Sequence, residues 1–249
     1  MNFLRSFTQP VIFAHRGASG YAPENTIAAF ELAVSMGADA IELDAKLSGD
    51  DVVMVMHDQT VDRTTDQSGN LRSFTVDQLK QMDAGSRFDA KFAGERIPTL
   101  AEVFEAVGQK TFINVELTNY QTSRDGLIDK VIELVDRYAM NERIIFSSFF
   151  PSNLMRAHKL KPHIPAALLC LPGKEGMVAR SFAGKWISPE LIHPYFSDVN
   201  AVMVNREKKR HRRVHVWTVN EPDEMKRLLD LGVQGIFTDF PDTAIQLRG

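Results

Sequence analysis

The chain is poor in the residues and segments that mark several large classes of protein. Its 249 residues include one cysteine, Cys170, which excludes an intrachain disulfide and indicates a reducing compartment. The formal net charge of −3 gives the chain no global positive field that would attract nucleic acid or an anionic membrane surface. No apolar run approaches the roughly 18 residues of a membrane-spanning helix, and the first ten residues lack the apolar core of a signal peptide. We therefore expect a cytoplasmic protein with no integral membrane segment and no nucleic-acid partner.

Short runs of apolar and β-branched residues recur along the chain, and helical patterns separate most of them. This alternation predicts parallel strands that are joined by helices. In 26–37, for example, Ile27, Phe30 and Val34 recur at helical spacing, with Asn25 or Thr26 as the N-cap. Further helices are expected in 99–108, 126–139 and 221–232. The expected strands are 11–15, 40–45, 52–57, 112–117, 143–148, 166–170, 186–188, 214–219 and 235–239.

The short connection between the second and third runs decides the topology. Only residues 46–51 separate them, whereas a parallel crossover needs about a dozen residues or more. The two runs must form an antiparallel hairpin, which leaves eight strands for a parallel set. Eight such units predict an α/β fold of the (β/α)8 TIM-barrel type, since the alternative, a doubly wound sheet, usually stops at about six strands. We expect a single domain over 1–249 with a small insertion after strand 2, at about 46–98, and an irregular segment of this length is usually functional.

Three acids stand where the expected strands end, which is the face of a TIM barrel that carries active sites. Glu42 and Asp44 are two residues apart on one strand and share a face. Glu116 interrupts the apolar run 112–117. Burying bare carboxylates is costly, and a hard divalent cation would offset that cost, because oxygen ligands favour Mg²⁺, Ca²⁺ or Mn²⁺. The alternatives are acids that pair with Arg or Lys, or that lie in water at a strand edge.

Two histidines and an arginine accompany the acids. His15 and Arg16 follow the first strand, and His57 ends the hairpin. Imidazole titrates near neutral pH, so the two histidines can divide acid and base work, while the guanidinium of Arg16 matches two phosphate oxygens. Together with a cation, these groups indicate hydrolysis of a phosphate ester. The remaining histidines are expected at the surface or as hydrogen-bonded core groups: His158, His163, His193, His211 and His215.

In their order and spacing, the motifs of the chain resemble the glycerophosphodiester phosphodiesterase family. They read HRG…PENT, ELD, HD, DRTT, ERIPTLAEVFE, VEL, VWTVN and GIFTDFP, and they run from about residue 12 to residue 241. The resemblance implies a TIM barrel with an insertion after strand 2. It also implies hydrolysis of a small-molecule glycerophosphodiester, with a divalent cation, to sn-glycerol 3-phosphate and an alcohol.

Carried onto this sequence, the resemblance implies a role for each candidate residue. Glu42, Asp44 and Glu116 would bind the cation, His15 and His57 would be the acid and the base, and Arg16 would hold phosphate. Trp217 would form an apolar wall against the glycerol carbons, with packing of the barrel as the alternative. The chain departs from the family at Thr118, because the family motif Glu-Leu-Lys carries a lysine there that faces the phosphate.

Other interpretations stay open at this point. A related lysophospholipase D and a non-catalytic barrel that binds phosphodiesters are the alternatives to the hydrolase, and a homo-oligomer is left open. The basic segment 206–213, REKKRHRR, is expected to be a solvated helix face. Phospholipid head groups or an acidic partner are the alternatives for this segment.

Overall fold

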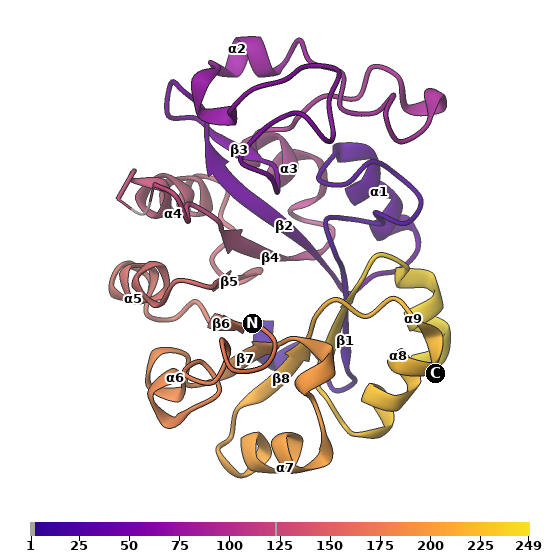
Figure 1. Cartoon of the computed structure of the whole chain (residues 1–249), viewed down its shortest axis with the longest axis vertical. Helices are drawn as coiled ribbons and strands as arrows, with labels where there is room; N and C mark the ends of the chain where they lie inside the picture. Colours follow the sequence, from indigo (N-terminus) through magenta and orange to yellow (C-terminus); the bar gives the residue numbers. More distant parts are fainter. Residues whose placement is uncertain (1–2, 123) are drawn as a thin grey trace.

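The computed structural model describes residues 3–122 and 124–249, and it shows a closed ring of eight parallel strands (Figure 1). The ring closes because β1 pairs with β2 on one side and with β9 on the other. The TIM barrel predicted from the alternation of strands and helices is therefore confirmed. In order around the ring, its strands are β1 (Val11–Ala14), β2 (Ala40–Leu47), β4 (Phe112–Leu117), β5 (Ile144–Ser148), β6 (Ala166–Cys170), β7 (Leu191–Pro194), β8 (Arg213–Val216) and β9 (Gly235–Thr238).

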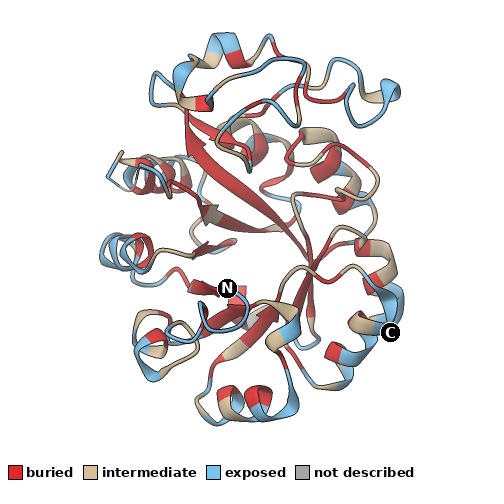
Figure 2. Cartoon of the chain, in the orientation of Figure 1, coloured by how far each residue is buried: buried red, intermediate tan, exposed pale blue. Residues whose placement is uncertain are grey.

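Helices surround the ring, with their buried residues toward the strands and their exposed residues outward (Figure 2). Local sequence sets where they begin: Thr26 caps the first helix by accepting the N–H of Ala29, and Thr99 forms a capping box with Glu102. Among the described residues, none of the helices has the length and apolar character needed to cross a bilayer. The helices around the ring are α1 (Ile27–Ser35), α3 (Leu100–Val107), α4 (Leu127–Arg137), α5 (Pro151–Leu160), α6 (Phe182–Ile187), α7 (Ala201–Lys209), α8 (Pro222–Asp230) and α9 (Pro241–Arg248).

The predicted hairpin lies outside the ring. β3 (Val53–Val55) runs antiparallel to the end of β2, as the short connection required. The segment between β3 and α3 then lies beside the ring, at the edge of the molecule, with α2 (Val76–Leu79) and short 3₁₀ turns at Leu71–Ser73 and Ala90–Phe92 (Figure 1). It has an apolar cluster of its own, which consists of Met54, Met56, Val61, Leu71, Leu79, Met82, Ala84 and Ile97.

The interior of the barrel is apolar at its N-terminal end. The 3₁₀ turn at Phe3–Arg5 lies in the middle of the ring (Figure 1), and the Phe3 ring packs edge-on against Phe112 with centroids 5.3 Å apart. One layer further along the strands, Phe13 and Phe237 stack with centroids 4.3 Å apart. Aromatic rings therefore form a dry floor below the C-terminal face, where the polar residues gather.

The expected strand at 186–188 is wrong. These residues form the end of α6 and its C-cap, and the sixth strand of the chain's parallel set is instead β7, Leu191–Pro194. The helix begins because Ser181 accepts the N–H groups of Ala183 and Gly184. Trp186 is 84% exposed, so this apolar run does not belong to the buried sheet. A run of three residues has no period that separates a strand from a short helix.

Two histidines also depart from the expectation. His193 on β7 and His215 on β8 are both fully buried inside the barrel, with ring centroids 5.2 Å apart. Among the residues that the structure describes, neither ring nitrogen of either histidine has a hydrogen-bond partner. Burial lowers the pKa of His193 well below its ordinary value and that of His215 to about 3, so both rings are neutral. The interpretation as surface or hydrogen-bonded core groups is therefore wrong for this pair.

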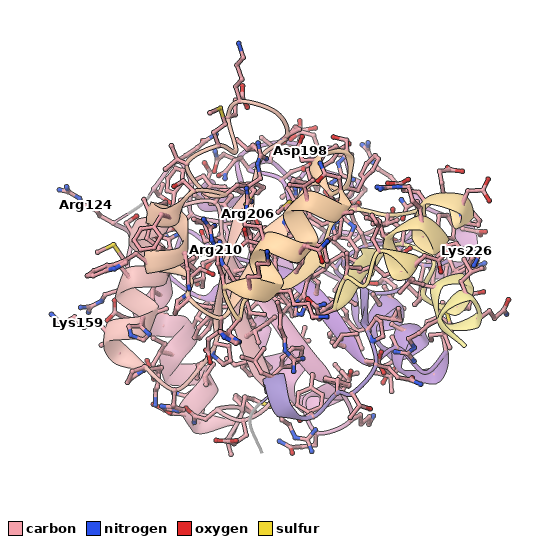
Figure 3. All side chains as sticks on the ribbon, turned by 90° about the horizontal axis from the view of Figure 1, so that it is seen from below. Arg124, Lys159, Asp198, Arg206, Arg210 and Lys226 are labelled. Carbon is pink, nitrogen blue, oxygen red and sulfur yellow. The ribbon has the colours of Figure 1, made fainter. Side chains whose placement is uncertain are left out.

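The expected solvated face of 206–213 is wrong for Glu207 and Arg212. Both side chains are fully buried, whereas Arg206 on α7 and Arg210, which directly follows it, are partly exposed (Figure 3). Glu207 accepts from Arg206 at 2.8 Å and from Arg210 at 3.2 Å, and its other oxygen lies 3.5 Å from Arg212. Three arginines of the basic segment 206–213 therefore contact the one buried carboxylate of Glu207.

Candidate active site

Three carboxylates converge at the C-terminal end of the barrel strands. Glu42 and Asp44 face inward from β2, and Glu116 faces inward from β4 in register with Asp44. One oxygen from each of the three lies within 4.8 Å of the others. Glu42 and Asp44 are 3% and 1% exposed, whereas Glu116 is half-buried at the cavity wall. The alternation of side chains along a strand, read from the sequence, correctly placed these acids together.

The acids repel one another in this low-dielectric setting. Burial raises the pKa of Glu42 well above its ordinary value, and the charges of Asp44 and Glu116 add to the rise. Burial likewise raises the pKa of Glu116 to about 7, with Asp44 as the next cause and the Tyr120 hydroxyl opposing it. Burial also acts to raise the pKa of Asp44, but Arg16 and other cations outweigh it and the net direction is downward. Three oxygen donors with excess negative charge fit a hard divalent cation.

A sharp turn after β1 brings donors onto two of these acids. Arg16 and Asn25 both adopt left-handed backbone, each with φ of 57°. The backbone N–H of Arg16 donates to Glu42 at 3.0 Å, and its guanidinium Nε lies 3.5 Å from Asp44. Asn25 donates its side-chain amide to the same Asp44 oxygen at 2.9 Å. The two residues therefore set the orientation of the carboxylates of β2.

His15 is oriented by an acid from the last strand. Its Nδ1 lies 2.7 Å from the Asp239 carboxylate. Ser19 and Asn220 donate to Asp239 at 2.8 and 2.6 Å. Burial acts to raise the pKa of Asp239, but the contact with His15 outweighs it and leaves that pKa at about 2. An ionised Asp239 favours a proton on Nδ1, which leaves Nε2 to serve the site.

His57 is held in the same way by the insertion. Its Nδ1 lies 2.7 Å from Asp58, which also accepts from Arg63 at 2.7 Å. Arg63 in turn donates two hydrogen bonds of 2.7 Å to Glu24. Glu24 accepts from Arg16 at 3.0 Å, so a chain of charged contacts links the two sides of the site.

A small cavity of about 90 Å³ joins these groups. His15, His57 and Glu116 line one part of it, and Phe149 and Trp217 line another. The Trp217 ring meets Phe149 edge-on with centroids 5.5 Å apart, and its Nε1 donates to the His193 carbonyl at 2.7 Å. Trp217 is therefore fixed as part of an apolar wall beside the acids.

Several residues that build the site were not identified by chemical reasoning from the sequence. That reasoning looked for isolated acids, bases and cations, and it passed over residues whose role depends on a partner far along the chain. The five residues that were missed are Glu24, Asn25, Arg63, Asp239 and Tyr120. The motifs PENT, DRTT and GIFTDFP contain the first four of them and were the available signal. The fifth, Tyr120, donates its hydroxyl to Glu116 at 2.6 Å.

Comparison with known proteins identifies the family of the chain. A family model described as the glycerophosphoryl diester phosphodiesterase family matches residues 15–243. A glycerophosphodiester phosphodiesterase of Caldanaerobacter subterraneus subsp. tengcongensis is 41% identical over 95% of this chain and 97% of its own length. A glycerophosphodiester phosphodiesterase of Bacillus altitudinis is 37% identical over 95% of this chain and 97% of its own. A phosphodiesterase of Oleispira antarctica, solved with the product sn-glycerol-3-phosphate, is similar in structure with a TM-score of 0.88, at 29% identity and 96% coverage of both chains.

Proposed function

Because the chain belongs to the glycerophosphoryl diester phosphodiesterase family, we propose that it hydrolyses glycerophosphodiesters to sn-glycerol 3-phosphate and an alcohol with a divalent cation. The observation that carries the proposal is the arrangement of two histidines around one cluster of acids. Each imidazole has its Nδ1 2.7 Å from a carboxylate, and both line the cavity that Glu42 and Glu116 also line. This is the geometry that general acid–base chemistry on an anionic ester needs.

Glu42, Asp44 and Glu116 would hold the cation. Their oxygens are close enough together for one ion. The raised pKa values of Glu42 and Glu116 reflect the free-energy cost of ionising buried, neighbouring carboxylates, which a cation would offset. When bound, a divalent cation neutralises charge on the phosphoryl oxygens and lowers the pKa of a nucleophilic hydroxyl. Oxygen ligands support Mg²⁺ or Ca²⁺, with Mn²⁺ as a third choice.

His15 and His57 would move the protons. One imidazole takes the proton of the attacking oxygen, which belongs to water or to the glycerol 2-hydroxyl, as that oxygen forms its bond to phosphorus. The other gives a proton to the alcohol oxygen as its bond to phosphorus breaks. Attack by water gives sn-glycerol 3-phosphate directly, whereas attack by the 2-hydroxyl gives a cyclic phosphate, which water then opens to sn-glycerol 3-phosphate. The His15–Asp239 and His57–Asp58 contacts suit either task, because each acid stabilises the imidazolium that forms.

Arg16 and Trp217 would position the substrate. The Arg16 guanidinium is pinned between Glu24 and Asp44 beside the cavity, where it can balance phosphate charge. Trp217 and Phe149 offer an apolar wall that suits the carbons of glycerol. The site thus has a charged side for phosphate and an apolar side for the alcohol backbone.

The test is hydrolysis of glycerophosphocholine followed through release of sn-glycerol 3-phosphate. Activity should disappear after exhaustive EDTA treatment and return with Mg²⁺, Ca²⁺ or Mn²⁺. Full activity in EDTA would exclude the cation, and binding of the diester without turnover would identify a non-catalytic barrel. Lysophosphatidylcholine, assayed in parallel, separates this function from that of a lysophospholipase D, which would turn over the lysolipid faster.

We also propose that residues 1–249 act as one domain in the cytoplasm. The insertion at about 46–98 supplies His57 and Arg63 to the site of the barrel, which supports a single functional unit. The lone Cys170 is buried, and burial raises the pKa of its thiol to about 12, which is compatible with a reducing compartment. Limited proteolysis and cell fractionation test these two statements.

A further inference from the structure

Lys46 lies beside the acid cluster but takes no part in the function described so far. It follows Glu42 and Asp44 at alternate positions of β2, so its side chain projects from the same face of the strand. Lys46 is 5% exposed, which is rare for a lysine. Asp44, Glu116 and Asp58 are the acids whose charges act on its ammonium group.

Thr118 holds the Lys46 ammonium in place. Its hydroxyl donates to the Ala45 carbonyl at 2.8 Å, and this leaves the oxygen free to accept from Lys46 Nζ at 2.6 Å. Thr118 is 2% exposed, and its backbone N–H is bonded to the same carbonyl at 3.3 Å. A short, branched and doubly anchored side chain therefore fixes the end of a long, flexible one.

The ammonium keeps donor capacity for a ligand. It has three N–H donors, and one of them is used by Thr118. Within the described ranges 3–122 and 124–249, no carboxylate oxygen forms an ion pair with it. Lys46 and Thr118 also line a cavity of about 340 Å³ between the insertion and the loop after β4. A buried cation with unused donors at a cavity wall suits an anion, because an anion would offset the cost of burying the charge.

We propose that Lys46 binds a phosphoryl oxygen of the glycerophosphodiester and that Thr118 positions it. The proposal rests on the proposed function and names a further substrate-binding residue for it. It also accounts for Thr118 at the place of the family lysine: the positive charge is present, but it comes from the neighbouring strand β2 and meets position 118 through a hydrogen bond. Lys46 would then be a second side-chain cation for the phosphate, in addition to Arg16, each reaching it from the wall of its own cavity.

The experiment measures the affinity for sn-glycerol 3-phosphate by calorimetry in the cation that supports hydrolysis. Lys46→Gln should weaken binding by about 10- to 100-fold, the range of a lost charge-assisted hydrogen bond. Adding Thr118→Lys to that variant should recover about tenfold or more, since it returns the charge to the same place. Lys226→Gln is the matched control, because Lys226 is exposed on α8 at the periphery of the molecule (Figure 3), and it should change nothing.

A second titration separates this role from a structural one. Removing a positive charge beside three carboxylates should leave the affinity for the divalent cation unchanged or make it tighter. Lys46→Gln should therefore weaken binding of sn-glycerol 3-phosphate without weakening binding of the cation. A merely structural lysine would weaken both together, and that result, or unchanged product affinity, overturns the proposal. If Lys46→Gln does not fold, Thr118→Val tests the same contact, and wild-type product affinity in that variant also overturns it. Hydrolysis by the wild-type protein reports separately on the proposed function.

Discussion

The Nδ1 atom of His15 lies 2.7 Å from a carboxylate oxygen of Asp239, so residues 224 positions apart in the chain are joined by one hydrogen bond. His15 directly follows the first strand of the ring and Asp239 directly follows the last. These strands are neighbours only because the barrel closes. Closure therefore creates the oriented imidazole, and the candidate chemistry depends on it.

We expect His15→Ala and His57→Ala each to lower kcat by about 10²- to 10⁴-fold, the usual contribution of a general acid or base. Each imidazole is oriented by its own acid and faces the acid cluster. Steady-state kinetics with glycerophosphocholine provide the measurement. His158→Ala on the exposed face of α5 should retain wild-type turnover. A variant of His15 or His57 with the parent kcat would show that this histidine is structural.

Glu116→Gln should stabilise the cation-free protein at alkaline pH. The folded-state pKa of Glu116 is raised to about 7, chiefly by burial. Between about pH 4.5 and 7 the folded protein retains a proton that the unfolded chain has released, so stability falls as pH rises through this window. The Glu116→Gln variant has no carboxyl to titrate, so its stability should not fall in this window. At pH 8 its free energy of unfolding should exceed that of the wild type by up to about 3 kcal/mol.

Urea unfolding in EDTA at pH 4 and pH 8 measures the effect of Glu116→Gln. Wild type and variant should differ most at pH 8 and least at pH 4. Glu31→Gln, at an exposed position of α1, serves as the control for loss of one negative charge. A variant less stable than wild type at pH 8 would contradict the argument from repulsion.

His215→Leu should make the protein more resistant to acid. Burial lowers the folded-state pKa of His215 to about 3, whereas the unfolded chain takes up this proton below about pH 6.5. The neutral His215 therefore leaves the free energy of unfolding undiminished above pH 6.5. As the pH falls from 6.5 toward 3, this free energy decreases by up to about 1.4 kcal/mol per pH unit. Denaturant unfolding at pH 7 and pH 4.5 should show a smaller pH slope in the variant. His158→Leu should keep the wild-type slope, and an equal slope in His215→Leu would refute the prediction.

Glu207→Gln should destabilise the protein by about 3–5 kcal/mol, because it leaves the buried Arg212 without its counter-charge. Arg206 and Arg210 would lose the same partner. Glu133→Gln removes an exposed i,i+4 pair with Arg137 and should cost less than about 1 kcal/mol. Thermal and urea unfolding of the two variants compare the costs directly. Similar stability losses would mean that the buried cluster is no more important than a surface pair.

Local pattern in the sequence determined much of the architecture. Alternating strands and helices predicted the ring, and the short connection before β3 required its hairpin, because a chain of that length cannot cross over to a parallel neighbour. The spacing of Glu42 and Asp44 placed both on one face for the same geometric reason. These conclusions needed only the reach and the period of the backbone.

Tertiary structure decided the features that depend on distant partners. Residues 186–188, which were expected to form a strand, instead end the helix α6 that Ser181 caps. The strand of this part of the chain is Leu191–Pro194. No local pattern shows that Lys46 meets Thr118, which lies 72 residues away on another strand. Nor does the sequence show that His193 and His215 share one dry interior. Burial and pairing across the barrel set the charge state and orientation of such groups, because desolvation and contact energies exist only once the ring has closed.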